Sequence, residues 1–164
     1  MIKPMMSNDE ILFIEKNLND DKTMLEWGSG NSTIYFSKFV KELVSIEHNY
    51  EWYLYVKNAI KWYNIDNIKL YYVEPNEKVT IPSVKSQLID YIEFPKTLNI
   101  IFDIVLIDGR ARQHCAYSIL DYIKENGLLF MHDFYDRTRY HNVLDIYDKV
   151  DEITEGAGIV SLMK

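Results

Sequence analysis

The chain has 164 residues and a mass of 19.5 kDa, a size that favours one domain over two. Hydrophobic residues make up 48% of it and charged residues 26%, as in folded globular proteins, which argues against disorder. The 25 acidic and 18 basic side chains give a net charge of −7. This balance argues against nucleic acid and anionic membranes as partners.

The single cysteine, Cys115, excludes an intrachain disulfide and a cysteine-rich zinc site. No catalytic dyad can be argued from its spacing, so we expect it to pack in a helix. The sequence shows no signal peptide and no run of roughly 20 apolar residues. We therefore expect a cytoplasmic protein without a membrane segment.

Apolar residues recur at helical or strand spacing in an alternating order along the chain. Ser7 and Glu10 form a capping box that predicts a helix within residues 1–20. The other expected elements are a strand over 23–27, a helix over 31–40, a strand over 43–47, a helix after Asn49, a strand over 68–73, a short helix over 86–92, a strand over 102–107, a helix ending at Gly127, a strand over 128–131, a helix over 140–150, and short strands over 152–154 and 159–163.

This alternation predicts an α/β fold of the doubly wound, Rossmann-like type, with a mostly parallel seven-stranded sheet and helices on both faces. Too few residues join the last two strands for a parallel crossover, so we expect an antiparallel final strand. The whole chain, 1–164, forms one domain. Within it, residues 76–100 form an irregular, functional loop punctuated by Pro75, Pro82 and Pro95.

A candidate cofactor site follows the first strand. That strand runs into Glu26-Trp27-Gly28-Ser29-Gly30-Asn31-Ser32-Thr33, whose glycines allow a tight turn and close approach of a ligand. Glu47 ends the second strand, where an acid can hold ribose hydroxyls, and His48 follows it. Residues 26–33, 47 and 48 therefore predict a nucleotide-type site.

Two features separate the candidate nucleotides. A dinucleotide fingerprint needs a third glycine where Thr33 stands. The negative charge of Glu26 would repel a pyrophosphate but suits a cationic ligand. A dinucleotide-dependent oxidoreductase is therefore an alternative that these residues argue against.

Over residues 20–164 the sequence resembles the class I S-adenosylmethionine-dependent methyltransferases. Their acid-x-Gly-x-Gly motif is matched by residues 26–30, and their ribose-binding acid by Glu47. The closest resemblance is to a compact branch with Asp108-Gly109-Arg110-Ala111-Arg112 after the fourth strand and His132-Asp133 after the fifth. The resemblance implies S-adenosylmethionine in the loops after strands one to three, with Asn76 or a neighbour near adenine.

The ends of strands four and five are the candidate catalytic centre. Methyltransferases of this kind that need a metal place Mg²⁺ ligands there, which implies Asp108 and Asp133. Phe134, however, stands where an amide ligand usually follows the second acid, and no lysine base follows Asp108. His132 is the alternative base, and its purely structural role would be to orient Asp133.

The four arginines contrast with the 14 lysines, because they all follow strands four and five: Arg110, Arg112, Arg137 and Arg139. Their guanidinium groups suit carboxylates and phosphates, so Arg110 and Arg112 are candidates for holding an anionic acceptor. The structural alternative is that the arginines form ion pairs with nearby acids such as Asp136. The four histidines also follow predicted strand ends, at positions 48, 114, 132 and 141.

The expected function is O-methylation of a small or carbohydrate-like, anionic hydroxyl acceptor. The main alternative is a non-catalytic S-adenosylmethionine-binding or scaffold protein. A chain of this length has little room for a separate acceptor-binding domain. Segment 76–100, the first helix or a partner subunit, such as a second copy of the chain, must therefore supply the acceptor pocket.

Overall fold

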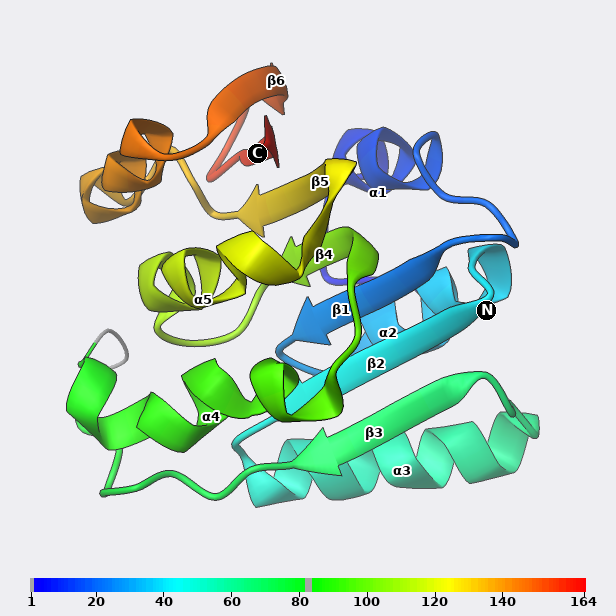
Figure 1. Ribbon diagram of the computed structural model, residues 1–164. Coiled ribbons are helices and arrows are strands. Elements are labelled where there is room, and N and C mark those ends of the chain that lie inside the picture. The colour runs from blue at the N-terminus through cyan, green and yellow to red at the C-terminus, as the bar shows by residue number, and fades with distance from the viewer. Residues whose placement is uncertain (1, 82–83) are drawn as a thin grey trace.

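The structure is a computed structural model that describes residues 2–81 and 84–164. Pro82, predicted to punctuate the 76–100 segment, lies outside the described residues. Seven strands form one sheet in the order β3-β2-β1-β4-β5-β7-β6 (Figure 1). They are β1 (Thr23–Trp27), β2 (Glu42–Glu47), β3 (Ile68–Tyr72), β4 (Phe102–Ile107), β5 (Ile123–His132), β6 (Asp148–Ile153) and β7 (Ile159–Met163). Strand β7 is antiparallel to both neighbours, and the other pairings are parallel, which confirms the predicted fold.

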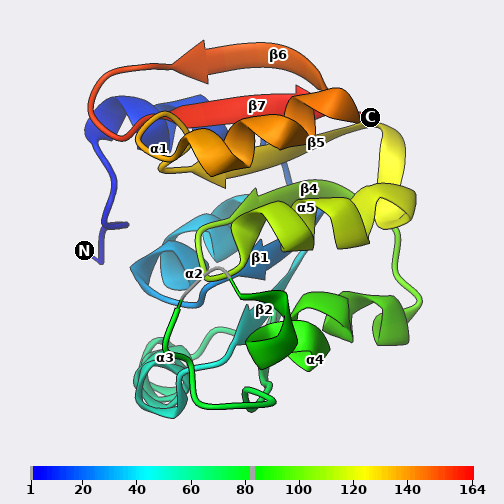
Figure 2. The same ribbon diagram turned by 90° about the vertical axis from the view of Figure 1, so that its left-hand side faces the viewer.

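Helices cover both faces of the sheet, as the two views in Figures 1 and 2 show. The α-helices are α1 (Asn8–Glu15), α2 (Asn31–Phe36), α3 (Tyr50–Tyr63), α4 (Ile89–Glu93) and α5 (Arg112–Ile119). Shorter 3-10 helices are η1 (Ser37–Phe39), η2 (Lys85–Leu88), η3 (Phe94–Leu98), η4 (Leu120–Tyr122) and η5 (Thr138–Asp145). In the part of the chain that the structure describes, no helix is long and apolar enough to cross a bilayer.

Each face of the sheet has its own apolar core. On one face, Trp27, Ile107 and Met131 lie in a buried cluster with residues of α4, α5 and η5. On the other, α1 and α2 cover a second cluster, in which the rings of Phe13 and Phe130 meet edge to face at 5.7 Å. The predicted capping box is present at the start of α1, and Cys115 is buried in α5 as predicted.

The carboxyl ends of β1, β2, β4 and β5 meet at one edge of the sheet, because these strands are parallel neighbours. The loops after β1 and β4 touch there. Gly28 has φ +94°, and a Cβ on it would lie 2.6 Å from Gly109 Cα. Both the left-handed backbone and this contact require glycine at position 28. The turn after β1 is thereby fixed against the start of the Asp108 loop.

Two sequence predictions about the C-terminal half are wrong. The helix expected to end at Gly127 stops at Ile119, and β5 already begins at Ile123. Gly127 lies in an irregular part of β5, where a Cβ would meet Ile123 Cγ2 at 2.6 Å. Crowding in a bulged strand therefore explains this glycine, rather than a helix end.

The helix expected over 140–150 is also shorter than predicted. It is the 3-10 helix η5, which ends at Asp145, and Val150 lies in β6. Tyr140 and Val143 are buried as the helical spacing suggested, whereas Val150 is half exposed. The helical spacing identified the buried face of η5 correctly. It also assigned residues of β6 to the helix, although pairing with β7 holds them in an edge strand.

Candidate active site

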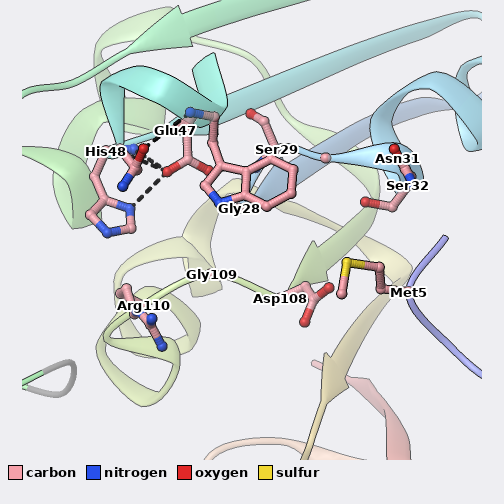
Figure 3. A pocket seen from close by; sticks show the side chains of 13 residues that line it. Met5, Gly28, Ser29, Asn31, Ser32, Glu47, His48, Asp108, Gly109 and Arg110 are labelled. Carbon is pink, nitrogen blue, oxygen red and sulfur yellow. Dashed lines mark hydrogen bonds and ion pairs between the residues drawn. The ribbon is translucent and has the colours of Figure 1, made fainter. Parts of the chain in front are cut away.

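A pocket of about 390 Å³ opens at the carboxyl ends of β1, β2 and β4. Its lining contains most of the predicted cofactor loop together with residues after β2 and β4. These residues are Met5, Gly28, Ser29, Gly30, Asn31, Ser32, Glu47, His48, Asn49, Trp52, Asp108, Gly109 and Arg110. Figure 3 shows Met5 and Asp108 toward one end of the pocket, away from His48 and Arg110. We call this cavity the donor pocket.

Glu47 is held in the donor pocket by backbone groups. Its carboxylate accepts hydrogen bonds from the backbone N–H groups of Ser29, His48 and Asn49 at 2.7–2.9 Å. Figure 3 marks the contacts with His48, including the Nδ1–Oε1 approach of 3.0 Å. One carboxylate thus joins the loop after β1 to the loop after β2. Its position is fixed before any ligand arrives.

Glu26 lies beneath this loop and does not line the donor pocket. It is completely buried and accepts hydrogen bonds from the hydroxyls of Ser32, Thr33 and Ser45. Burial raises the pKa of Glu26 to about 7, although these hydrogen bonds act in the opposite direction. Its position indicates a structural role, which is to hold the start of α2 against β1 and β2.

Two other predicted cofactor residues also lie beneath the pocket surface. Trp27 is fully buried, and its indole N–H donates to the Tyr91 carbonyl at 3.0 Å. Thr33 is fully buried, and its hydroxyl accepts a hydrogen bond from Gly30 N. Neither side chain lines the donor pocket. Trp27 is therefore a core residue and not a cofactor ligand of the donor pocket.

Asp108, His132 and Asp133 come together at the ends of β4 and β5. Their potential ligand atoms lie within 4.8 Å of one another. Asp108 Oδ1 is 2.9 Å from His132 Nδ1, so the imidazole and this carboxylate form a hydrogen-bonded pair. Asp133 has φ +53°, which is uncommon for a residue with a side chain. Its carboxylate pairs with Arg112 and Arg137, each at 3.1 Å.

A second cavity, of about 680 Å³, lies on the other side of this cluster. The start of the chain, the end of β5 and the turn between β6 and β7 form its walls. The lining residues are Met5, Met6, Ser7, Asp9, Glu10, His132, Asp133, Ile153, Glu155, Gly156 and Ala157. Met5 lines both cavities, so the two adjoin. We call the second cavity the acceptor pocket, because the sequence predicts an acceptor beside the ends of the fourth and fifth strands.

Acidic neighbours control the charge of His132. Burial alone would lower its pKa, but the hydrogen bond with Asp108 and the charges of Asp108, Asp133 and Glu10 raise it above 6.5. Glu10 Oε1 lies 3.4 Å from His132 Nε2. The other oxygen of Glu10 accepts the Ser7 N–H in the capping box of α1. The cap of the first helix therefore also contributes to the environment of His132.

The four arginines do not form the open basic rim that the sequence suggested. Arg112 is buried, and its guanidinium donates hydrogen bonds to main-chain carbonyl oxygens. Arg137 pairs with Asp133, and Arg139 lies over the Tyr140 ring at 4.9 Å. Arg110 is exposed and lines the donor pocket. The structural alternative, ion pairing with nearby acids, describes Arg112 and Arg137, with Asp108 and Asp133 as the partners.

Segment 76–100 was expected to border the acceptor. Of its described residues, none lines either cavity. Asn76, considered for contact with adenine, exchanges hydrogen bonds with Asp90. Tyr91 packs beneath the loop after β4, where a Cβ on Gly109 would meet its hydroxyl. The segment thus supports the donor pocket from below, and residues of the first helix line the second cavity instead.

Several pocket residues were not predicted. Asn49 and Trp52 line the donor pocket from the start of α3, and an aromatic residue soon after the second-strand acid was a usable signal. Met5 and Glu10 had no such signal, because only the fold brings them to the end of β5. His114 and His141 follow strand ends as predicted, yet neither lines these two cavities.

A Mg²⁺ ion does not fit the residues at this centre. Asp108 Oδ1 already contacts His132 Nδ1 and Arg112 Nη2, and Asp133 Oδ2 contacts two guanidinium groups. Phe134 is buried and adds no oxygen ligand. Magnesium requires several oxygen ligands at about 2.1 Å. At this centre Asp108 Oδ1 and Asp133 Oδ2 are paired with guanidinium groups instead.

No family model and no curated protein matches the chain. Solved structures do match. A methyltransferase-like protein from Silicibacter pomeroyi shares 20% identity at a TM-score of 0.78, over 99% of this chain and 88% of that one. A candidate caffeoyl-CoA O-methyltransferase from Staphylococcus aureus shares 15% at 0.71, over 98% and 86%. A candidate methyltransferase from Streptococcus mutans, solved in complex with SAH, shares 10% at 0.68, over 98% and 99%. The chain therefore has the Rossmann-like methyltransferase fold.

Proposed function

We propose that this chain is an S-adenosylmethionine-dependent methyltransferase that methylates a hydroxyl group of a small molecule. One observation carries the proposal: two cavities adjoin at Met5, and the Asp108–His132 pair lies between them. Asp108 faces the donor pocket, and His132 faces the acceptor pocket. A reaction between two bound molecules requires this kind of arrangement.

The donor pocket suits S-adenosylmethionine in charge and shape. Glu47 offers carboxylate oxygens for ribose hydroxyls, and Asp108 offers negative charge near the positive end of the ligand. A Cβ on Gly30 would meet nothing within 4 Å, so the loop faces open space there. When bound, S-adenosylmethionine supplies a methyl group on a sulfonium centre. The chain must then orient the nucleophile and accept its proton.

His132 is the residue placed to accept that proton. Asp108 holds Nδ1 at 2.9 Å, which leaves Nε2 directed toward Glu10 and the acceptor pocket. A hydrogen bond from Nδ1–H to Asp108 keeps the lone pair on Nε2, where it can take the hydroxyl proton. Asp108 then stabilises the imidazolium that forms. The side chain of His132 is only 11% exposed, and this burial strengthens the interaction between the imidazolium and Asp108.

The charge of the acceptor pocket argues against the anionic acceptor expected from the sequence. The lining contains neither lysine nor arginine. It contains four acids: Asp9, Glu10, Asp133 and Glu155. Of the two predicted anion ligands, Arg112 donates its N–H groups to protein oxygens, and Arg110 lines the donor pocket instead. We therefore propose a neutral or cationic hydroxyl-bearing acceptor.

Isothermal titration calorimetry of the purified chain tests the donor assignment. We expect saturable binding of S-adenosylmethionine and of its demethylated product, and no comparable heat with NAD⁺. Binding of NAD⁺ alone would favour the oxidoreductase alternative. Failure of both methyl-donor ligands to bind would contradict the proposal.

Transfer of a labelled methyl group to a panel of neutral, cationic and anionic hydroxyl compounds tests the proposed methyl transfer and the charge of the acceptor. We expect turnover with members of the first two groups and less with matched anionic compounds. Tight donor binding without transfer to any compound would favour the non-catalytic alternative.

A further inference from the structure

The buried guanidinium of Arg112 occupies the space between the two strand-end acids. Its Nη2 lies 3.2 Å from Asp108 Oδ1 and 3.1 Å from Asp133 Oδ2. The same nitrogen donates to the Asp108 carbonyl at 3.0 Å. Nη2 thus lies against one oxygen of each carboxylate, in the position of a bridging cation. One positively charged nitrogen therefore joins the two acids directly.

The rest of the guanidinium is also fixed. Nε donates to the Gly109 carbonyl at 2.9 Å, and Nη1 donates to the His132 carbonyl. Arg112 is 4% exposed, so water competes little for these groups. One side chain thus joins the loop after β4 to the end of β5. A group with so many partners has no free N–H fork for an acceptor.

Charge balance at the cluster points the same way. Asp108 and Asp133 carry two negative charges, and Arg112 and Arg137 supply two positive charges within 3.2 Å of them. The four side chains therefore sum to zero before His132 is counted. A divalent cation would add two positive charges next to a guanidinium that cannot lose its proton.

We infer that Arg112 is an internal cation that replaces the divalent metal between Asp108 and Asp133, and that it positions Asp108 against His132. Arg112 is a positioning residue in this scheme, because it touches the acids and main-chain oxygens rather than either pocket. The inference deepens the proposed function, and it predicts a methyl transfer that proceeds in the presence of a chelator. The prediction about metal binding can be tested without any measurement of catalytic activity.

Mn²⁺ binding, followed by electron paramagnetic resonance of the free ion, tests the inference on the whole chain. We expect no saturable site in the wild type at millimolar Mn²⁺. The variant R112M removes the charge and leaves two carboxylates and an imidazole facing one another, a ligand set that suits a transition metal. We expect this variant to bind Mn²⁺ at least about 100-fold more tightly, since a neighbouring unit charge repels a divalent ion strongly at a partly buried site.

The matched control is R137M, which removes the other arginine partner of Asp133 and leaves Arg112 in place. It should not gain the site. D133N in the R112M background should lose it again, which locates the ion. Should R112M fail to fold by circular dichroism, R112Q takes its place, because its amide can still donate to a main-chain oxygen.

Two results would overturn the inference. One is saturable Mn²⁺ or Mg²⁺ binding by the wild type that D133N abolishes. The other is a folded R112M or R112Q that binds Mn²⁺ no better than the wild type. Neither measurement involves S-adenosylmethionine, so failure here is distinguishable from failure of the proposed function.

Discussion

The two pockets are built in different ways. The donor pocket is lined mainly by continuous stretches, residues 28–32, 47–49 and 108–110, and its key carboxylate is held by backbone N–H groups. The acceptor pocket is assembled from residues 5–10, the end of β5 and the β6–β7 turn, and its polar contacts are mostly between side chains. The first should therefore depend on backbone geometry, and the second on charge. Substitutions in each can test that division.

The largest effect is expected at the boundary between the pockets. His132→Gln removes the proposed base and should lower kcat for methyl transfer by roughly 10²- to 10⁴-fold. The affinity for S-adenosylmethionine should stay unchanged, because His132 does not line the donor pocket. Steady-state kinetics and calorimetry measure the two quantities separately. His114→Gln, outside both pockets, is the control, and a His132 variant that keeps its rate would remove the base assignment.

On the donor side, Glu47→Gln should weaken binding of S-adenosylmethionine by roughly 10- to 100-fold, the range for one lost hydrogen bond to a charged group. The amide cannot accept equally through both of its ends, so the loops after β1 and β2 lose part of their common anchor. Glu42→Gln is the control, since it lies at the opposite end of β2 and pairs with Lys69. Equal affinities of the two variants would contradict the assignment.

Beneath the donor pocket, Glu26 makes stability depend on pH. Its pKa is about 7 in the fold, raised by burial from 4.5. The folded state therefore binds the proton more tightly, and this stabilisation is complete below pH 4.5 and lost as pH rises through 7. The difference corresponds to about 3 kcal/mol in the free energy of unfolding. Denaturant titrations should show that the free energy of unfolding declines less steeply between pH 4.5 and 7 for Glu26→Gln than for the wild type. Parallel curves for the two proteins would exclude this role of Glu26.

The smallest effect is expected on the acceptor side. Glu10→Gln keeps a capping box but removes one negative neighbour of His132. The pKa of His132 should fall, because that charge helps to raise it. A base must be unprotonated, so the acid limb of the kcat–pH profile should move to lower pH. Glu15→Gln, on the same helix but outside both pockets, should leave the profile in place. An unchanged acid limb in the Glu10 variant would contradict the claim that Glu10 raises the pKa of the catalytic base.

The same division explains what the sequence could predict. The mostly parallel seven-stranded sheet, its antiparallel final strand and the loop at 28–32 follow from hydrophobic periodicity and short-range patterns. Glu47 was identifiable because its distance from the glycines is set by one β-α-β unit. Glu26 and Trp27 belong to the same motif, but burial, which periodicity did not resolve, places them beneath the pocket.

The first helix was among the predicted sources of the acceptor pocket, but the residues of the pocket could not be predicted, because its walls are far apart in the chain. Nothing in residues 5–10 indicates that Glu10 lies 3.4 Å from the imidazole of His132. The arginines show the same limit. Their clustering after β4 and β5 is visible in the sequence, whereas the burial of Arg112 among main-chain oxygens depends on the register of two strands.

A crystal structure grown with S-adenosylhomocysteine would test the donor assignment most directly. We predict that the ligand lies in the donor pocket, with its ribose against Glu47 and its sulfur end toward Asp108 and Met5. A ligand seated outside residues 28–32 and 47–49, in crystals that leave the pocket open to solvent, would contradict the division into donor and acceptor pockets.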